Sequence, residues 1–226
     1  MRACRRNSYW LNLDDEWERI MENPGERLVG DYLRHIKGCD FIDFNVPTKR
    51  VQGEIDVIGV APAKKRAYIC EVATHLTTGI QYVKERHPDT ATRLIKKFIR
   101  DINYGKEEFR GYNVSYMLWS PVVHRCGANV KYDQFAHLKR VADEIKAKTK
   151  VEIEFITNEA YLDAVGELRK FAGREHKELK SPVMRFLQIE EWSRRNCRNI
   201  ARKSSERSGR ANFELAEFNR LGSAPN

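Results

Sequence analysis

The chain has 226 residues, of which 41% are hydrophobic and 32% are charged, and its formal net charge at pH 7 is +9. These values are ordinary for a soluble globular protein, and the length suits one domain of good size with appendages. The sequence has no apolar run long enough to cross a bilayer, and residues 1–6 lack the apolar core of a signal peptide. We therefore expect a cytoplasmic protein with no membrane partner.

The excess of basic residues, together with a pI of about 9.3, favours a polyanionic partner. DNA is the expected partner, RNA is the alternative, and the sequence leaves a homodimer open. The five cysteines are widely spaced and include no Cys-x-x-Cys pair. Neither a zinc knuckle nor a disulfide framework is therefore indicated.

Residues 1–22 are expected to form an N-terminal arm that contains a short helix. A longer helix then begins with Asn23 as its N-cap and Pro24 at its first position. Glu26 follows three residues after the cap, which is typical of a capping box. The same carboxylate can also point from the helix toward an acidic hairpin and help to hold a metal ion. The sequence leaves both roles open.

Three short strands are expected over residues 40–46, 53–60 and 68–75, and the last two are interpreted as an antiparallel hairpin. Both strands of the hairpin combine β-branched residues with carboxylates. Because strand side chains alternate between faces, Asp56 and Glu71 converge if the hairpin brings their faces together. Grouped carboxylates suit Mg²⁺ or Mn²⁺. The alternative is an exposed hairpin edge with solvated acids.

A clear helix begins at residues 88–90 and runs to about residue 103, with apolar positions along one side. Its other side carries basic residues at spacings of three and four. This basic stripe is either a solvated face or a face that contacts phosphate groups, or takes part in catalysis, beside the metal. Its members are Arg93, Lys96, Lys97 and Arg100.

We expect residues 23–173 to form the core of the protein and residues 174–226 to form a basic C-terminal helix with a flexible tail. The later elements of the core alternate between strands and helices. They are a strand over 114–119, a helix over 131–148, a strand over 151–156 and a helix capped by Asn158 that ends near residue 173; the appended helix spans 182–200, and the tail begins at residue 201.

The order of these elements is helix, three strands, helix, strand, helix, strand, helix, with an acid on the second strand and another on the third. This order resembles the PD-(D/E)xK nuclease superfamily, through Gly53-Glu54-Ile55-Asp56-Val57-Ile58 and Ile69-Cys70-Glu71-Val72. The resemblance covers roughly residues 23–173. It implies an α/β fold of the restriction-endonuclease-like type, an α+β sandwich in which helices flank a central mixed sheet of about five strands.

The resemblance also implies a metal site for one or two Mg²⁺ ions, with Mn²⁺ as a substitute. By position, Asp56 is the first metal ligand and Glu71 is the second. The backbone carbonyl of Val72 is a further ligand, and Glu26 is the auxiliary acid on the first helix.

The chain departs from the family pattern at Ala73, where the motif has a lysine. Alanine has no proton or charge to contribute. The missing ammonium group can come from Lys84, Lys96 or Lys97, or His75 can act on the attacking water instead. The remaining interpretation is that the site binds without catalysing.

Two functions follow from this reasoning. The first is a Mg²⁺-dependent DNA endonuclease, for which host defence and DNA repair are natural settings. The second is a catalytically inactive module of the same fold that binds nucleic acid or a partner protein. A small-molecule enzyme is the weakest interpretation, because the chain has no cofactor fingerprint and such an activity leaves the basic charge unexplained.

Overall fold

The computed structural model describes residues 23–48, 53–125 and 133–221, and the predicted N-terminal arm lies outside them. The chain divides after Leu168 into two compact units. This boundary falls inside helix α5 (Glu159–Arg174), whereas the sequence placed it at the end of that helix.

The first unit is built on a mixed sheet of five strands, as the sequence predicted. Its first three strands form an antiparallel meander, and the last two are parallel to the third. The order across the sheet is β1 (Phe41–Pro47), β2 (Glu54–Ala61), β3 (Arg66–Val72), β6 (Asn113–Ser120) and β7 (Ile153–Thr157).

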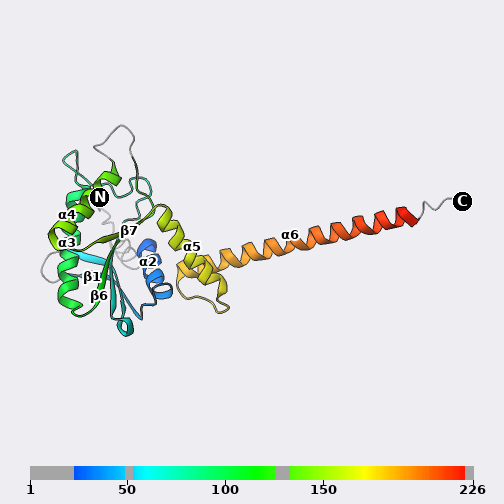
Figure 1. The fold of residues 1–226 in the computed structure, drawn as a ribbon, viewed down its shortest axis with the longest axis horizontal. Helices are drawn as coiled ribbons and strands as arrows, with labels where there is room; N and C mark the ends of the chain where they lie inside the picture. The colour runs from blue at the N-terminus through cyan, green and yellow to red at the C-terminus, as the bar shows by residue number, and fades with distance from the viewer. Residues whose placement is uncertain (1–22, 49–52, 126–132, 222–226) are drawn as a thin grey trace, which may run out of the picture. The chain divides into compact units, whose positions relative to one another are not determined.

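Helices cover both faces of this sheet (Figure 1). Helices α3 (Thr90–Glu108) and α4 (Gln134–Thr149) pack against each other on one side, and α2 (Pro24–His35) packs on the other against the three meander strands. The core under α3 and α4 is apolar, with Phe98 and Ile102 fully buried in it. The α/β class and the flanked mixed sheet are therefore confirmed.

The start of α2 shows how the sequence specifies local structure. The side chain of Asn23 caps the helix by accepting a hydrogen bond from the Gly25 N–H at 3.0 Å. Glu26 Oε1 accepts a hydrogen bond from the Asn23 side-chain amide at 2.8 Å. The acid thus supports the cap through the asparagine side chain, and its position is fixed by that contact.

The segment between β3 and α3 contains a small hairpin. Strand β4 (Val83–Lys84) pairs with β5 (His87–Pro88) in an antiparallel two-stranded sheet. The two residues between them, Glu85 and Arg86, have φ angles of 50° and 63°. The pattern did not predict this hairpin because its strands are only two residues long.

Asn158 is the residue that the sequence predicted as the cap of α5. The helix does begin at the next residue, and the Asn158 carbonyl accepts the Leu162 N–H. The side chain, however, bonds both backbone groups of Val123: its oxygen accepts from the N–H at 2.8 Å, and its nitrogen donates to the carbonyl at 3.1 Å. The Asn158 side chain thus binds the backbone of a loop that is distant in sequence.

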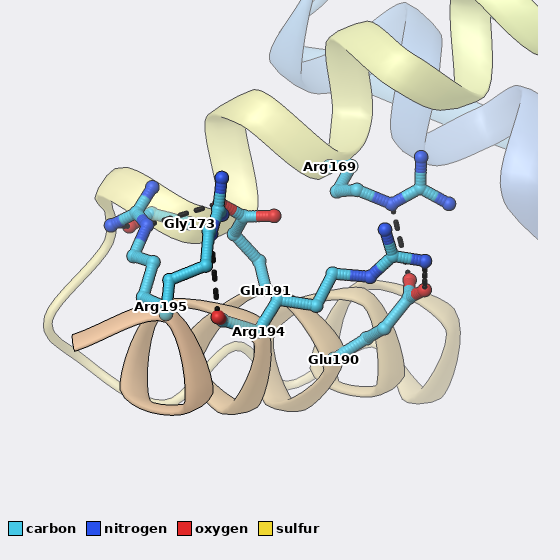
Figure 2. A network of polar contacts seen from close by, with 7 residues as sticks. Arg169, Gly173, Glu190, Glu191, Arg194 and Arg195 are labelled. Carbon is cyan, nitrogen blue, oxygen red and sulfur yellow. Dashed lines mark hydrogen bonds and ion pairs between the residues drawn. The ribbon is translucent and has the colours of Figure 1, made fainter. Parts of the chain in front are cut away.

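The second unit consists of the last turns of α5 and helix α6 (Pro182–Leu221), and Figure 2 shows the polar contacts between them. Arg169 of α5 pairs with Glu190 of α6 at 3.1 Å. Arg195 donates a hydrogen bond to the Gly173 carbonyl at 2.5 Å, which satisfies a backbone acceptor at the end of α5. These contacts explain why the unit boundary lies inside α5.

Helix α6 continues to Leu221, so the predicted end of this helix at residue 200 is wrong. The stretch after Ile200 contains several alanine, arginine, glutamate and leucine residues, which favour helix. It also lacks proline as far as Pro225. Within the residues that the structure describes, no helix combines the length and the apolar character that crossing a bilayer requires.

Gly59 lies where α2 approaches β2, and a Cβ at this position would lie 2.9 Å from Leu33 Cδ1 and 3.1 Å from Cys39 Sγ. Gly59→Val is therefore expected to lower the free energy of unfolding by about 1–3 kcal/mol through overpacking. Gly166→Ala is the control, because that site has open space and lies within α5. It should raise the free energy of unfolding by roughly 0.5–1 kcal/mol. Urea unfolding of both variants tests this, and equal shifts would contradict it.

Candidate functional site

Asp56 of β2 and Glu71 of β3 lie side by side at the site. In the antiparallel β2–β3 pair, Val57 lies opposite Cys70. Asp56 precedes Val57 and Glu71 follows Cys70, so the two acids lie opposite each other on adjacent strands. They share the sheet face that α3 covers. Asp56 is 9% exposed and Glu71 is 1% exposed. The convergence expected from strand alternation is thus present, and the acids are buried instead of solvated.

Burial shapes the protonation of both acids. It raises the pKa of Asp56 to about 7, and the charge of Glu71 adds to the effect, whereas Lys97 and the Val72 N–H oppose it. The hydrogen bond from the Val72 N–H to Asp56 Oδ2 is 2.6 Å long. Burial likewise raises the pKa of Glu71 to about 7, with repulsion from Asp101 as the next cause. The pair therefore needs positive charge nearby if it is to be ionised.

Helix α3 supplies that positive charge. Lys97 Nζ forms an ion pair with Glu71 Oε2 and lies 3.9 Å from Asp56 Oδ1. Arg100 Nη2 binds the other oxygen of Glu71 at 2.7 Å. Desolvation lowers the pKa of Lys97, but Glu71 and then Asp56 outweigh it and hold this pKa above its ordinary value. Lys97 is thus a protonated ammonium group between the two carboxylates.

Asp101 belongs to the same charge network and was missed in the sequence. It is fully buried, and its Oδ1 accepts a hydrogen bond from Arg100 Nε at 2.8 Å. The signal was present: Asp101 follows Phe98 by three residues and Leu94 by seven, so it lies on the apolar face of α3. A carboxylate on such a face requires a partner, because burying it unpaired is costly.

A cavity of about 450 Å³ opens beside this network. Asp56 lines it, and Glu71 is not among its lining residues. All four members of the basic stripe of α3 line it, so the stripe faces a hollow next to the acids. The lining residues are Gly53, Glu54, Asp56, Arg93, Lys96, Lys97 and Arg100.

Gly53 allows Arg100 to approach. Its φ is 144°, which few residues other than glycine adopt, and a Cβ at this position would overlap the Arg100 guanidinium group. Any side chain at this position would therefore displace Arg100 from its place between Glu71, Asp101 and the cavity.

Glu26 lies near this site without lining its cavity. Burial raises the pKa of Glu26, and the negative charge of Asp56 is the next cause. Together with Asn23, Arg27 and Phe44, Glu26 lines a separate cavity of about 60 Å³. A role for Glu26 as an auxiliary ligand stays a prediction, and so does the role of the Val72 carbonyl.

The other candidates for the missing lysine function are placed differently. His75 is exposed beyond the end of β3, Lys84 is exposed in β4, and neither lines the cavity. Lys96 lines the cavity, and Lys97 both lines it and contacts the acids. Ala73 is only 7% exposed and belongs to the apolar core cluster. A lysine at that position would bring its side chain into this cluster.

The described residues contain no group of three or more His, Cys, Asp or Glu side chains arranged to hold a metal ion. Comparison of the chain with models of protein families, with curated proteins and with solved structures found no match. A function is therefore inferred from the geometry of this site.

Asp56 should make stability depend on pH. Its pKa is about 7 in the folded protein against 3.8 for an unperturbed aspartate, so its stabilising contribution is complete below about pH 4 and is lost as the pH rises toward 7. Between pH 5 and 8 we expect the free energy of unfolding of the wild type to fall by roughly 2–3 kcal/mol more than that of Asp56→Asn.

Urea unfolding across this pH range measures the difference. Asp163→Asn, which changes an exposed carboxylate of α5, serves as the control and should follow the wild type. Parallel pH profiles for the wild type and Asp56→Asn would contradict the prediction.

Proposed function

We propose that this protein is a metal-dependent nuclease that hydrolyses phosphodiester bonds in DNA, and that it belongs to the PD-(D/E)xK superfamily. The observation that carries the proposal is the position of Lys97, whose ammonium group meets the carboxylates of Glu71 and Asp56. In the superfamily a lysine two residues after the second acid serves this site. Here a helix supplies the ammonium group to the same pair of acids. Host defence and DNA repair are both settings that suit such an enzyme.

The fold supports the proposal through the location of the acids. They lie on the second and third strands of an antiparallel meander that is followed by a helix and a parallel strand. This is the element order on which the resemblance was based. Likeness of fold alone does not establish an activity, so the chemistry of the site must carry the argument.

The two acids are ligands of the type that a hard divalent cation prefers. Asp56 and Glu71 offer carboxylate oxygens, and Mg²⁺ typically takes one or two protein carboxylates while keeping several waters. Burial, and then repulsion from a neighbouring carboxylate, raises the pKa of both acids, and a bound cation would favour their charged forms. When bound, Mg²⁺ or Mn²⁺ would supply Lewis-acid stabilisation of the phosphate and a lower pKa for water.

The basic residues would have two different roles in the reaction. Lys97, held protonated by the two acids, can donate a hydrogen bond to the attacking water or to a phosphate oxygen. Arg93, Lys96 and Arg100 line the cavity, where they can hold the phosphate in position. The carboxylate of Asp56 faces the same cavity and can accept a hydrogen bond from water.

A second candidate function is a nucleic-acid-binding module without catalysis, and one observation favours it. Both oxygens of Glu71 are engaged by cations of the protein, Lys97 and Arg100. In such a module this acid would hold α3 and its basic stripe against the sheet. The basic cavity would then bind phosphate without cleaving it.

Cleavage of supercoiled plasmid DNA in Mg²⁺, Mn²⁺ or EDTA tests the proposal. We expect metal-dependent nicking that falls at least about 100-fold in Asp56→Ala, Glu71→Ala and Lys97→Ala, the size of effect expected for a group that acts in proton transfer or charge stabilisation. Lys106→Ala is the matched control, because Lys106 is an exposed lysine farther along α3. It should retain activity within about twofold of the wild type.

DNA binding by the same variants separates the two functions. Loss of cleavage with retained binding in Asp56→Ala supports the nuclease. Binding by the wild type without cleavage in either metal would favour the binding module. Equal losses of cleavage activity in Lys97→Ala and Lys106→Ala would contradict the special role of Lys97.

A further inference from the structure

The β4–β5 hairpin directly precedes α3 in the chain. All five residues from Val83 to His87 are exposed, and Val83, an apolar residue, is 55% exposed. Lys84 and Arg86 give it two positive charges against one negative charge on Glu85. Both basic side chains are open to solvent, where a polyanionic partner can reach them.

The backbone of the hairpin turn is strained. Glu85 and Arg86 both have positive φ angles, as the two central residues of a type I′ turn do, and such turns favour Asn-Gly or Asp-Gly. Two non-glycine residues in the left-handed region are unfavourable, and strain of this kind clusters at functional sites. The turn thus presents an acidic and a basic side chain where small residues would be conformationally easier.

The base of the hairpin is fixed beside the cavity. The Asp89 N–H donates to the Tyr82 carbonyl at 2.8 Å, and the Tyr82 N–H donates to Thr90 Oγ1 at 2.9 Å. The guanidinium carbon of Arg93 lies 4.1 Å from the centre of the Tyr82 ring. Tyr82 also contributes to the raised pKa of Lys97. The base of the hairpin is therefore anchored through Tyr82 to Thr90 and to Arg93, which lines the cavity.

We propose that this hairpin, residues 83–88, enters the major groove of a DNA duplex whose phosphate group occupies the cavity. The inference rests on the proposed function only for the phosphate in the cavity. The major groove of B-form DNA, about 12 Å wide, admits a two-stranded β-ribbon. Lys84 and Arg86 can contact phosphates or base edges there, and Val83 can contact a thymine methyl group.

The same geometry distinguishes between nucleic acids. The major groove of A-form RNA is deep and too narrow for side chains to enter, and a single strand has no groove. The hairpin therefore favours duplex DNA over duplex RNA and over single strands. The basic cavity alone would bind all three through their phosphates, so the preference for duplex DNA should depend on the hairpin.

The test is fluorescence-anisotropy binding in EDTA, which needs neither metal nor cleavage. The variant Lys84→Gln/Arg86→Asn removes both positive charges and keeps a residue that tolerates positive φ at position 86. The matched control is Lys64→Gln/Lys65→Asn in the exposed turn at the opposite end of β2 and β3, where Lys65 has a φ of 46°. Thermal unfolding verifies that both variants are folded.

We expect the hairpin variant to bind duplex DNA about tenfold more weakly than the wild type, with a salt slope reduced by about one to two. The control should stay within about twofold of the wild type. Affinity for single-stranded DNA and duplex RNA should change little in either variant. Equal affinities of the hairpin variant and the control for duplex DNA, or an equal loss of affinity for single strands, would overturn the inference.

Groove occupancy is tested with a duplex whose cytosines carry bulky 5-substituents, which fill the major groove. The wild type should bind it more weakly than the plain duplex, and the hairpin variant should bind both duplexes alike. Binding of the wild type unaffected by the substituents would overturn the major-groove assignment. These binding measurements are made without metal, so their outcome does not depend on cleavage. The hairpin inference can therefore hold for a protein that does not cleave DNA, and it can be wrong for a protein that does.

Discussion

The burial of two carboxylates side by side is the constraint on which the site depends. Asp56 and Glu71 lie on adjacent strands below 10% exposure, where desolvation and mutual repulsion both disfavour their charged forms. Positive charge must therefore be brought to the sheet. Helix α3 provides it by turning Lys97 and Arg100 toward the acids while Phe98 fills the apolar core. The orientation of α3 about its axis therefore both fills the apolar core and places positive charge beside the buried acids.

This solution explains how the chain can have alanine at position 73. A lysine there would come from the strand that carries Glu71, but the side of the sheet at Ala73 is occupied by apolar core residues such as Ile80 and Leu94. Placing the ammonium group on α3 lets the core continue under the strand end. It also joins Lys97 to the rest of the basic stripe, so that one helix face neutralises the acids and lines the cavity.

The sequence predicted what depends on local periodicity. Strand alternation was enough to bring Asp56 and Glu71 together, and the Asn23 cap followed from its neighbours. The choice among lysines was not predictable, because Lys96 and Lys97 differ by about 100° around α3 and only docking on the sheet decides which one meets the acids. The partner of Asn158 likewise lies in a loop 35 residues away, beyond the reach of any local pattern.

The charge network also bears on how loss of activity in variants can be interpreted. Removing a buried carboxylate such as Asp56 relieves desolvation and repulsion, so it should stabilise the fold near neutral pH. Removing Lys97 leaves the same acids without their cation, which should destabilise it. The two changes therefore act on stability with opposite signs. If both abolish the same activity while the Lys97 variant remains folded, unfolding is not the common cause, and the shared loss comes from what the acids and the ammonium group do together in the cavity.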